Sequence, residues 1–200
     1  MTVFEAIEKR RSIRHFRDMP VEREKIIRAL DAARLSPSGH NRQPWRFVVV
    51  ESPQKKQELF AIFLRGIESG ENAAKLTCHY GYDSSSMKNS CMVIQRAPVS
   101  VLVFHTGEYC FNVEPGDFYG DNEVLTDQQS IGSAVENFIL AAREMDLGAL
   151  WVGHTVSIFE EVRAWLGTND ILVATIALGY PTRWPSARPR KSLDEIVNWI

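Results

Sequence analysis

The sequence predicts an α+β fold in one domain spanning residues 1–200. Segments with helical periodicity and short apolar strands are mixed along the chain, without the regular alternation of a doubly wound sheet. Neither GxGxxG nor GxxxxGK(S/T) occurs, so the motifs of Rossmann and P-loop nucleotide sites are missing. A length of 200 residues suits a single domain with a core of useful size.

The bulk composition argues against several classes of protein. Hydrophobic residues make up 44% of the chain, and a net charge of −2 does not favour nucleic acid as a partner. No apolar run reaches the ~18 residues of a membrane span, and the N-terminus lacks the charge-first pattern of a signal peptide. Three cysteines without a CxxC motif predict neither a disulfide framework nor a metal site. We therefore expect a cytoplasmic protein with reduced thiols.

The first fifty residues predict two helices and a strand. Thr2 and Glu5 form a capping-box pattern at the start of a helix over residues 3–11. Pro20 is expected to open a second helix, and the β-branched run RFVVVE, residues 46–51, predicts a buried strand. The apolar stripe of the second helix consists of Ile26, Ile27, Leu30 and Ala33.

The rest of the chain predicts further helices and strands. Gly167 is expected to close a short helix. The expected elements are a helix from Pro53, strands over 99–104, 149–153 and 171–179, a long helix over 127–146, and short helices capped by Ser157 with Glu160 and by Ser192 with Glu195.

Two variable segments are expected to form lids rather than core elements. Residues 66–95 are polar, with His79, Tyr80 and Tyr82 interleaved. Residues 105–127 contain six carboxylates and no lysine or arginine. Irregular segments of this length in a compact domain commonly serve as lids or mobile loops.

Two clusters of cations lie near the two ends of the chain. The motif KRRSIRHF, residues 9–16, places four cations within six positions, and RWPSARPRK, residues 183–191, supplies four more directly after a strand. Guanidinium groups bind phosphate through bidentate hydrogen bonds, so the two clusters together would suit a phosphate clamp. The first cluster alone also fits a solvated helix end, because cations are favourable at a helix C-terminus, and the second alone also fits a basic surface tail. The sequence does not show that the clusters meet.

The connection SPSGHNRQPW, residues 36–45, is the third notable segment. Two prolines and a glycine predict a rigid turn. Ser38, Asn41 and Gln43 are compact donors and acceptors that suit the edge of a planar polar ligand. An ordinary helix-to-strand connection has a similar composition, so both interpretations stay open.

Together and in this order, these segments resemble the FMN-dependent nitroreductase family. The resemblance spans residues 4–198 and is carried by RRSIRHF, AARLSPSGHNRQPWRFVVVE, ENFILAAREMDLGALWVG, IALGYP and RPRKSLDEI. It implies a nitroreductase-like fold with a central, mostly antiparallel sheet flanked by helices. It also implies an intimate homodimer that binds FMN non-covalently at the subunit interface.

The resemblance further implies which residues bind the cofactor. The first and last arginines would surround the phosphate end, while Arg14 would place a cation near flavin N1 and O2. The loop residues would reach the flavin from the partner subunit, where His40 is the one histidine expected near substrate. Backbone amides of Val152 and Gly153 would face N5 and O4. The implied cofactor-binding residues are Arg10, Arg11, Ser12, Arg14, Pro37, Ser38, Gly39, Asn41, Gln43, Asn89, Val152, Gly153, Arg188 and Arg190.

The implied activity is that of an NAD(P)H-dependent oxidoreductase. NAD(P)H would reduce FMN, and a nitroaromatic, a quinone or a similar electron-poor molecule would then reoxidise it at the same site, in ping-pong fashion. No metal or protein nucleophile is needed, because the flavin carries the chemistry and Arg14 tunes it electrostatically. The alternatives are a specialised relative such as a reductive dehalogenase or a flavin-fragmenting enzyme, a non-enzymatic FMN carrier or sensor, and an interaction domain without a cofactor.

Overall fold

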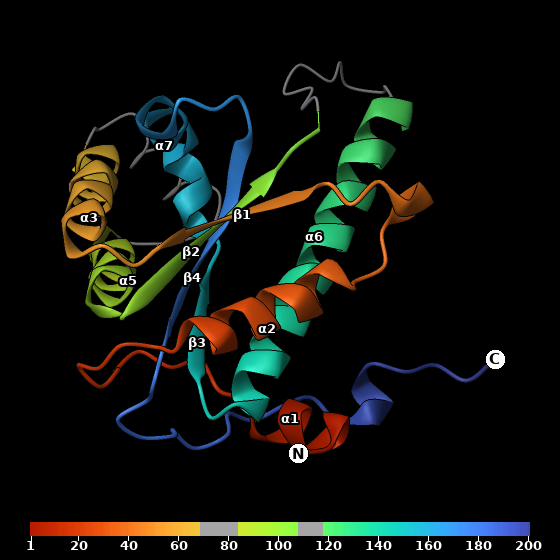
Figure 1. Cartoon of the computed structure of the whole chain (residues 1–200). Helices are drawn as coiled ribbons and strands as arrows, with labels where there is room; N and C mark the ends of the chain where they lie inside the picture. The colour runs from red at the N-terminus through yellow and green to blue at the C-terminus, as the bar shows by residue number, and fades with distance from the viewer. Residues whose placement is uncertain (69–83, 108–117) are drawn as a thin grey trace.

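The architecture is a central sheet with helices on both faces (Figure 1). The computed structural model describes residues 1–68, 84–107 and 118–200. In this part of the chain, four strands form one sheet in the order β1-β2-β4-β3, and every neighbouring pair is antiparallel. The predicted α+β fold with an antiparallel central sheet is therefore confirmed. The strands are β1 (Trp45–Val50), β2 (Val99–His105), β3 (Gly148–Val152) and β4 (Ile171–Gly179).

Two groups of helices cover the sheet. Helices α3, α5 and α7 lie on one face, and α2 and α6 lie on the other (Figure 1). The helices are α1 (Val3–Lys9), α2 (Arg23–Arg34), α3 (Pro53–Glu68), α5 (Ser84–Arg96), α6 (Phe118–Glu144) and α7 (Phe159–Leu166). Single 3-10 turns are η1 (Gly39–Asn41), η2 (His154–Ile158) and η3 (Leu193–Glu195).

Alternate residues of the central strands face two separate cores. Val101 and Val103 of β2 pack with α2 and α6, whereas Leu102 and Phe104 pack with α3, α5 and α7. All residues of β2 are buried. Because successive side chains of a strand point to opposite faces, this two-sided burial explains the continuous apolar runs in the sequence.

The expected lid segments are partly helical, and this corrects the sequence-based prediction. Residues 84–96 form α5, in which Met87, Cys91 and Ile94 are buried at helical spacing against α3. Helix α6 begins at Phe118, so much of the acidic stretch belongs to a helix rather than to a loop. His79, Tyr80 and Tyr82 lie outside the described residues.

Several predicted boundaries also change. Helix α1 ends at Lys9 because Arg10 adopts an extended backbone (φ −61°, ψ 137°). Helix α2 begins at Arg23, three residues after Pro20, and its Ile27 is exposed. Helix α7 has Ile158 rather than Ser157 as its N-cap, although Gly167 closes it as predicted. The Ser192 capping box is present, but it caps only one 3-10 turn.

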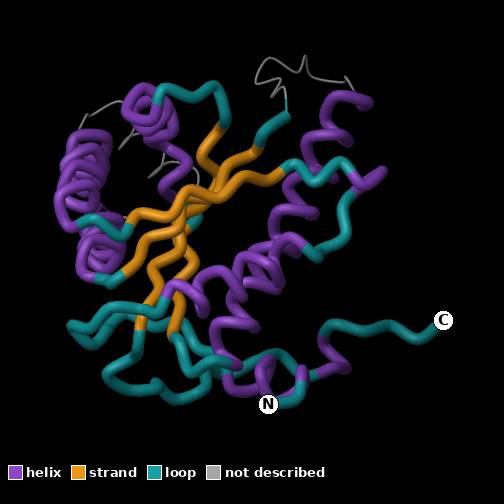
Figure 2. The backbone as a smooth tube through the Cα atoms, viewed as in Figure 1, coloured by secondary structure: helices purple, strands orange, loops and turns teal. Residues whose placement is uncertain are grey.

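The segment that follows α1 is joined by hydrogen bonds to both β3 and the end of β4. The amide of Ile13 donates to the carbonyl of Ala149 at 2.9 Å, and Arg17 N donates to Tyr180 O at 2.8 Å. The amide of Thr182 donates back to His15 O at 3.0 Å. Figure 2 shows the loops after α1 and after β4 at the same end of the sheet. These bonds bring the two ends of the sequence side by side.

The described residues contain neither a membrane-spanning helix nor a cluster of metal-binding side chains. Among them, no helix is long and apolar enough to cross a membrane, and no group of three or more His, Cys, Asp or Glu side chains lies close enough to hold a metal ion. Burial raises the pKa of the Cys91 thiol to about 12, so this thiol stays protonated. Cys78 and Cys110 lie outside the described residues.

Gly148 at the start of β3 leaves room for the segment after α1. A Cβ atom at this position would lie 2.5 Å from Ile13 Cγ1 and 2.9 Å from Ile13 Cβ. We expect Gly148→Ala to lower the free energy of unfolding by about 1–3 kcal/mol, because the buried Ile13 has little freedom to move. Gly153→Ala, whose Cβ would meet nothing within 4 Å, is the matched control. Denaturant titrations of both variants test this, and equal stabilities would contradict it.

Candidate functional site

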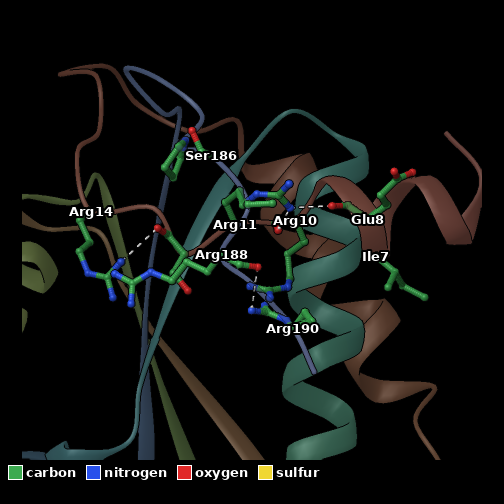
Figure 3. A pocket seen from close by; sticks show the side chains of 11 residues that line it. Ile7, Glu8, Arg10, Arg11, Arg14, Ser186, Arg188 and Arg190 are labelled. Atoms are coloured by element: carbon green, nitrogen blue, oxygen red, sulfur yellow. Dashed lines mark hydrogen bonds between the residues drawn. The ribbon is translucent and has the colours of Figure 1, made fainter. Parts of the chain in front are cut away.

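The two cation clusters meet in one pocket of ≈ 490 Å³. Figure 3 shows arginine side chains from the segment after α1 and from the C-terminal tail around the same space. The structure thus joins two segments that the sequence left separate. The pocket is lined by Ile7, Glu8, Arg10, Arg11, Ser12, Arg14, Pro185, Ser186, Ala187, Arg188 and Arg190.

The N-terminal arginines are held by backbone contacts around the end of α1. Arg11 Nη1 donates to the carbonyls of Glu8 at 2.6 Å and Arg10 at 2.7 Å, both of which lie at the end of the helix. Arg10 Nε lies 3.7 Å from Glu136 Oε1 of α6. Lys9 instead pairs with Glu5 along the helix at 3.2 Å, and it does not line the pocket.

The C-terminal arginines are delivered by the tail that follows β4. Trp184 fixes the start of this tail, because the Arg143 guanidinium of α6 lies 4.0 Å from the centre of its ring. Arg190 Nη1 donates to the carbonyl of Pro189 at 3.2 Å. Ser12 also lines the pocket, and its backbone forms a bridge to Ala149 of β3.

The pocket is strongly cationic. Five guanidinium groups and one carboxylate, that of Glu8, line it. Within the described part of the chain, Arg10 is the only one of the five with an acidic partner. Closely spaced like charges repel one another, and an anion that neutralises them gains the corresponding free energy.

The donors of this pocket fit a phosphate group. Arg11 Nε is buried and has no hydrogen-bond acceptor among the described residues, so it is a donor without a partner beside the pocket. The guanidinium groups and the Ser12 hydroxyl present N–H and O–H donors of the kind that phosphate oxygens accept. The phosphate end of FMN therefore suits the residues present.

A second pocket, of ≈ 650 Å³, shares Arg14 with the first. Arg14 therefore lies between the two spaces, and its Nη1 donates to Ser12 O at 3.4 Å. Asn89 and Met92 of α5 line the second pocket, so Asn89 lies in the same pocket as Arg14. The remaining lining residues are His15, Phe16, Val93, Arg96, Thr182 and Arg183.

The loop between α2 and β1 does not line the arginine pocket of its own chain. Residues 37–43, which include η1, lie beside the N-terminal half of α6. The arginine pocket lies near α1, at the other end of α6 (Figure 1). Asn41 and Gln43 have left-handed backbones, with φ of 56° and 51°, and both are exposed. In the structure, five predicted cofactor-binding residues of this loop therefore do not line the arginine pocket of their own chain. They are Pro37, Ser38, Gly39, Asn41 and Gln43.

The end of β3 carries the last of the predicted residues. Val152 is buried and closes the strand, and Gly153 follows as an exposed residue. Neither residue lines the arginine pocket.

Two features of the structure were not predicted from the sequence. The turn formed by Pro185, Ser186 and Ala187 lines the pocket, although its neighbours in RWPSARPRK were recognised. A buried pair, His105 with Asp127, lies beneath the α2–β1 loop at 3.0 Å. Both the acidic segment 105–127 and the helix expected over 127–146 include Asp127, and neither pattern indicates that its side chain is buried against His105 of β2.

A family model identifies the family of the chain, and its relatives include more than one kind of enzyme. The family model "Nitroreductase family" matches residues 7–180. A candidate "NAD(P)H nitroreductase Spy0809" of Streptococcus pyogenes serotype M6 is 46% identical over 211 residues, covering 98% of each chain. Iodotyrosine deiodinase 1 of Rattus norvegicus is 27% identical, covering 98% of this chain and 68% of its own length.

A solved structure shows the same fold with a flavin. The candidate nitroreductase of Desulfovibrio desulfuricans in complex with FMN is 26% identical, covers 100% of this chain and 98% of its own, and superimposes with a TM-score of 0.74. The family model ends before Arg188 and Arg190, so the C-terminal half of the pocket lies outside that match. The chain belongs to the nitroreductase family.

Proposed function

We propose that this protein binds FMN and uses NAD(P)H to reduce nitroaromatics, quinones or similar electron-poor small molecules in ping-pong fashion. The observation that carries the proposal is the pocket of five arginines in a chain of the nitroreductase family. The relative from Desulfovibrio desulfuricans, solved in complex with FMN, supports the same cofactor. The name of the Streptococcus pyogenes relative supports NAD(P)H as the electron donor.

The residues of the pocket would have two roles, which are to bind the cofactor and to set the electrostatic potential around it. Arg10, Arg11, Ser12, Arg188 and Arg190 would hold the phosphate end, where four guanidinium groups and one hydroxyl group line the pocket. When bound, FMN would supply the two-electron transfer between NAD(P)H and the acceptor. The protein side chains would bind, orient and set the electrostatic potential, and none of them would need to act as a nucleophile.

We also propose that the active form is a homodimer. The α2–β1 loop does not line the pocket of its own chain, so it would serve the flavin of a partner subunit. Phe4 is 84% exposed, and Trp199 in the tail is 92% exposed. The tail also extends away from the body of the chain (Figure 1). Large apolar side chains exposed in this way favour burial against another subunit.

The direct test is the visible spectrum of the purified protein, reconstituted with FMN, before and after anaerobic addition of NADH or NADPH. We expect bound flavin whose absorbance is bleached by at least one of the two donors and restored by nitrofurazone or menadione. Protein that retains no FMN would contradict the proposal. Bound FMN that neither donor reduces would indicate a carrier or sensor instead.

The same experiment separates the dehalogenase alternative, which the rat deiodinase relative motivates. Reduced protein is mixed with iodotyrosine in parallel with the two other acceptors. If iodotyrosine alone reoxidises the reduced protein, with release of iodide, the electron acceptor is a halogenated amino acid rather than a nitroaromatic or a quinone.

Arg14 supplies a test of electrostatic tuning. A guanidinium beside the flavin stabilises its reduced, more negative form, so Arg14→Ala should lower the midpoint potential. Loss of one charged hydrogen bond of about 1.5–3 kcal/mol corresponds to roughly 30–65 mV for two electrons. Potentiometric titration of the FMN-loaded variant measures this shift. Arg34→Gln is the control, because Arg34 pairs with Asp31 on the exposed side of α2. An unchanged potential in Arg14→Ala would remove this role from Arg14.

A further inference from the structure

The α2–β1 loop adopts a backbone that its own residues disfavour. His40, Asn41 and Gln43 all have positive φ, at 51°, 56° and 51°. A left-handed conformation costs roughly 1–2 kcal/mol for a residue with a Cβ atom, with asparagine the most tolerant of the three. Three such residues within four positions persist only where surrounding contacts determine the conformation.

Arg42, in the middle of these residues, is tied to a buried carboxylate. Its Nη2 donates to Asp127 Oδ1 at 2.7 Å, and the other oxygen, Oδ2, lies 3.0 Å from His105 Nε2. The side chains of Asp127 and His105 are 10% and 2% exposed. Because an ionised carboxylate only accepts hydrogen bonds, Nε2 of His105 is the donor. Asp127 of α6 thus joins the loop to the end of β2.

Neighbouring residues of α6 contact the same loop. Gly39 N donates to Ser130 Oγ at 3.4 Å, and a Cβ on Gly39 would lie 2.6 Å from Thr126 Cγ2. Within the loop, Gln43 N donates to Ser38 Oγ at 3.0 Å. Residues of α6 therefore contact the loop at Gly39 and at Arg42, and of these two hydrogen bonds the charge-assisted one between Arg42 and Asp127 is the stronger.

We propose that Asp127, supported by His105, is a positioning residue that holds the α2–β1 loop in its flavin-binding conformation through Arg42. The conformational half of this inference stands on the contacts above. The flavin half rests on the proposed function, because Ser38 and Asn41 contact FMN only if the protein binds it. The two halves can therefore be tested separately.

The experiment compares Asp127→Asn, Arg42→Gln and the double variant with the unaltered protein. Arg42→Gln is included because its side chain is 34% exposed, so its loss carries little risk to folding. Asp31→Asn, which removes the exposed ion pair with Arg34, is the matched control. Two quantities are measured: hydrogen exchange of the amides in residues 38–43 without FMN, and the dissociation constant and visible circular dichroism of bound FMN.

We expect each single variant to speed exchange of the Gly39 and Gln43 amides at least about tenfold, the change that follows from losing one charged hydrogen bond. FMN should bind at least about fivefold more weakly, and its visible circular dichroism should change. The double variant should show the same changes as each single variant, because each single substitution already removes the ion pair between Arg42 and Asp127. The control should match the unaltered protein.

Other results overturn the inference. Unchanged exchange in both single variants would show that Arg42 and Asp127 do not hold the loop. Faster exchange with an unchanged FMN dissociation constant and spectrum would leave only a structural role. If the unaltered protein binds no FMN, the proposed function fails, whereas the exchange data still judge the conformational half.

Discussion

The structure of the candidate site depends on a short stretch of backbone hydrogen bonds between the segment after α1 and the sheet. Ile13 bonds to Ala149 in β3, and Arg17 and His15 bond to the residues directly after β4. These bonds hold the two segments side by side and so place arginines of both clusters around one pocket. Gly148 permits this approach because a larger residue would overlap Ile13. An anion in the pocket would then be attracted by positive charges that the fold has already brought close together.

Much of the fold followed from local patterns in the sequence. The strand expected over residues 171–179 is β4, which is buried along nearly its whole length, and the helix expected over 127–146 coincides with most of α6. Helix α5 was missed because its buried positions, Met87, Cys91 and Ile94, lie among serines and polar residues that also suit a loop. Helix α1 ended early for a tertiary reason, since its continuation pairs with β3 rather than with its own turn.

The arginines of the pocket could be identified individually from the sequence, but their assembly into one pocket could not. Arg10, Arg14, Arg188 and Arg190 were recognised from their motifs, but their meeting required contacts between segments more than 160 positions apart. The environment of Asp127 was not predictable, because a carboxylate in an acidic stretch carries no sign of burial in its local sequence. Its partners, Arg42 and His105, come from two other elements.

The central claim is that the arginines recognise a phosphate group, and comparison of FMN with riboflavin tests it most directly, because riboflavin has the same ring system without the phosphate. Dissociation constants of both ligands are measured by fluorescence titration of the flavin-free protein. Two charged hydrogen bonds of about 1.5–3 kcal/mol each predict that FMN binds at least about one-hundredfold more tightly. Equal affinity for the two flavins would contradict the account.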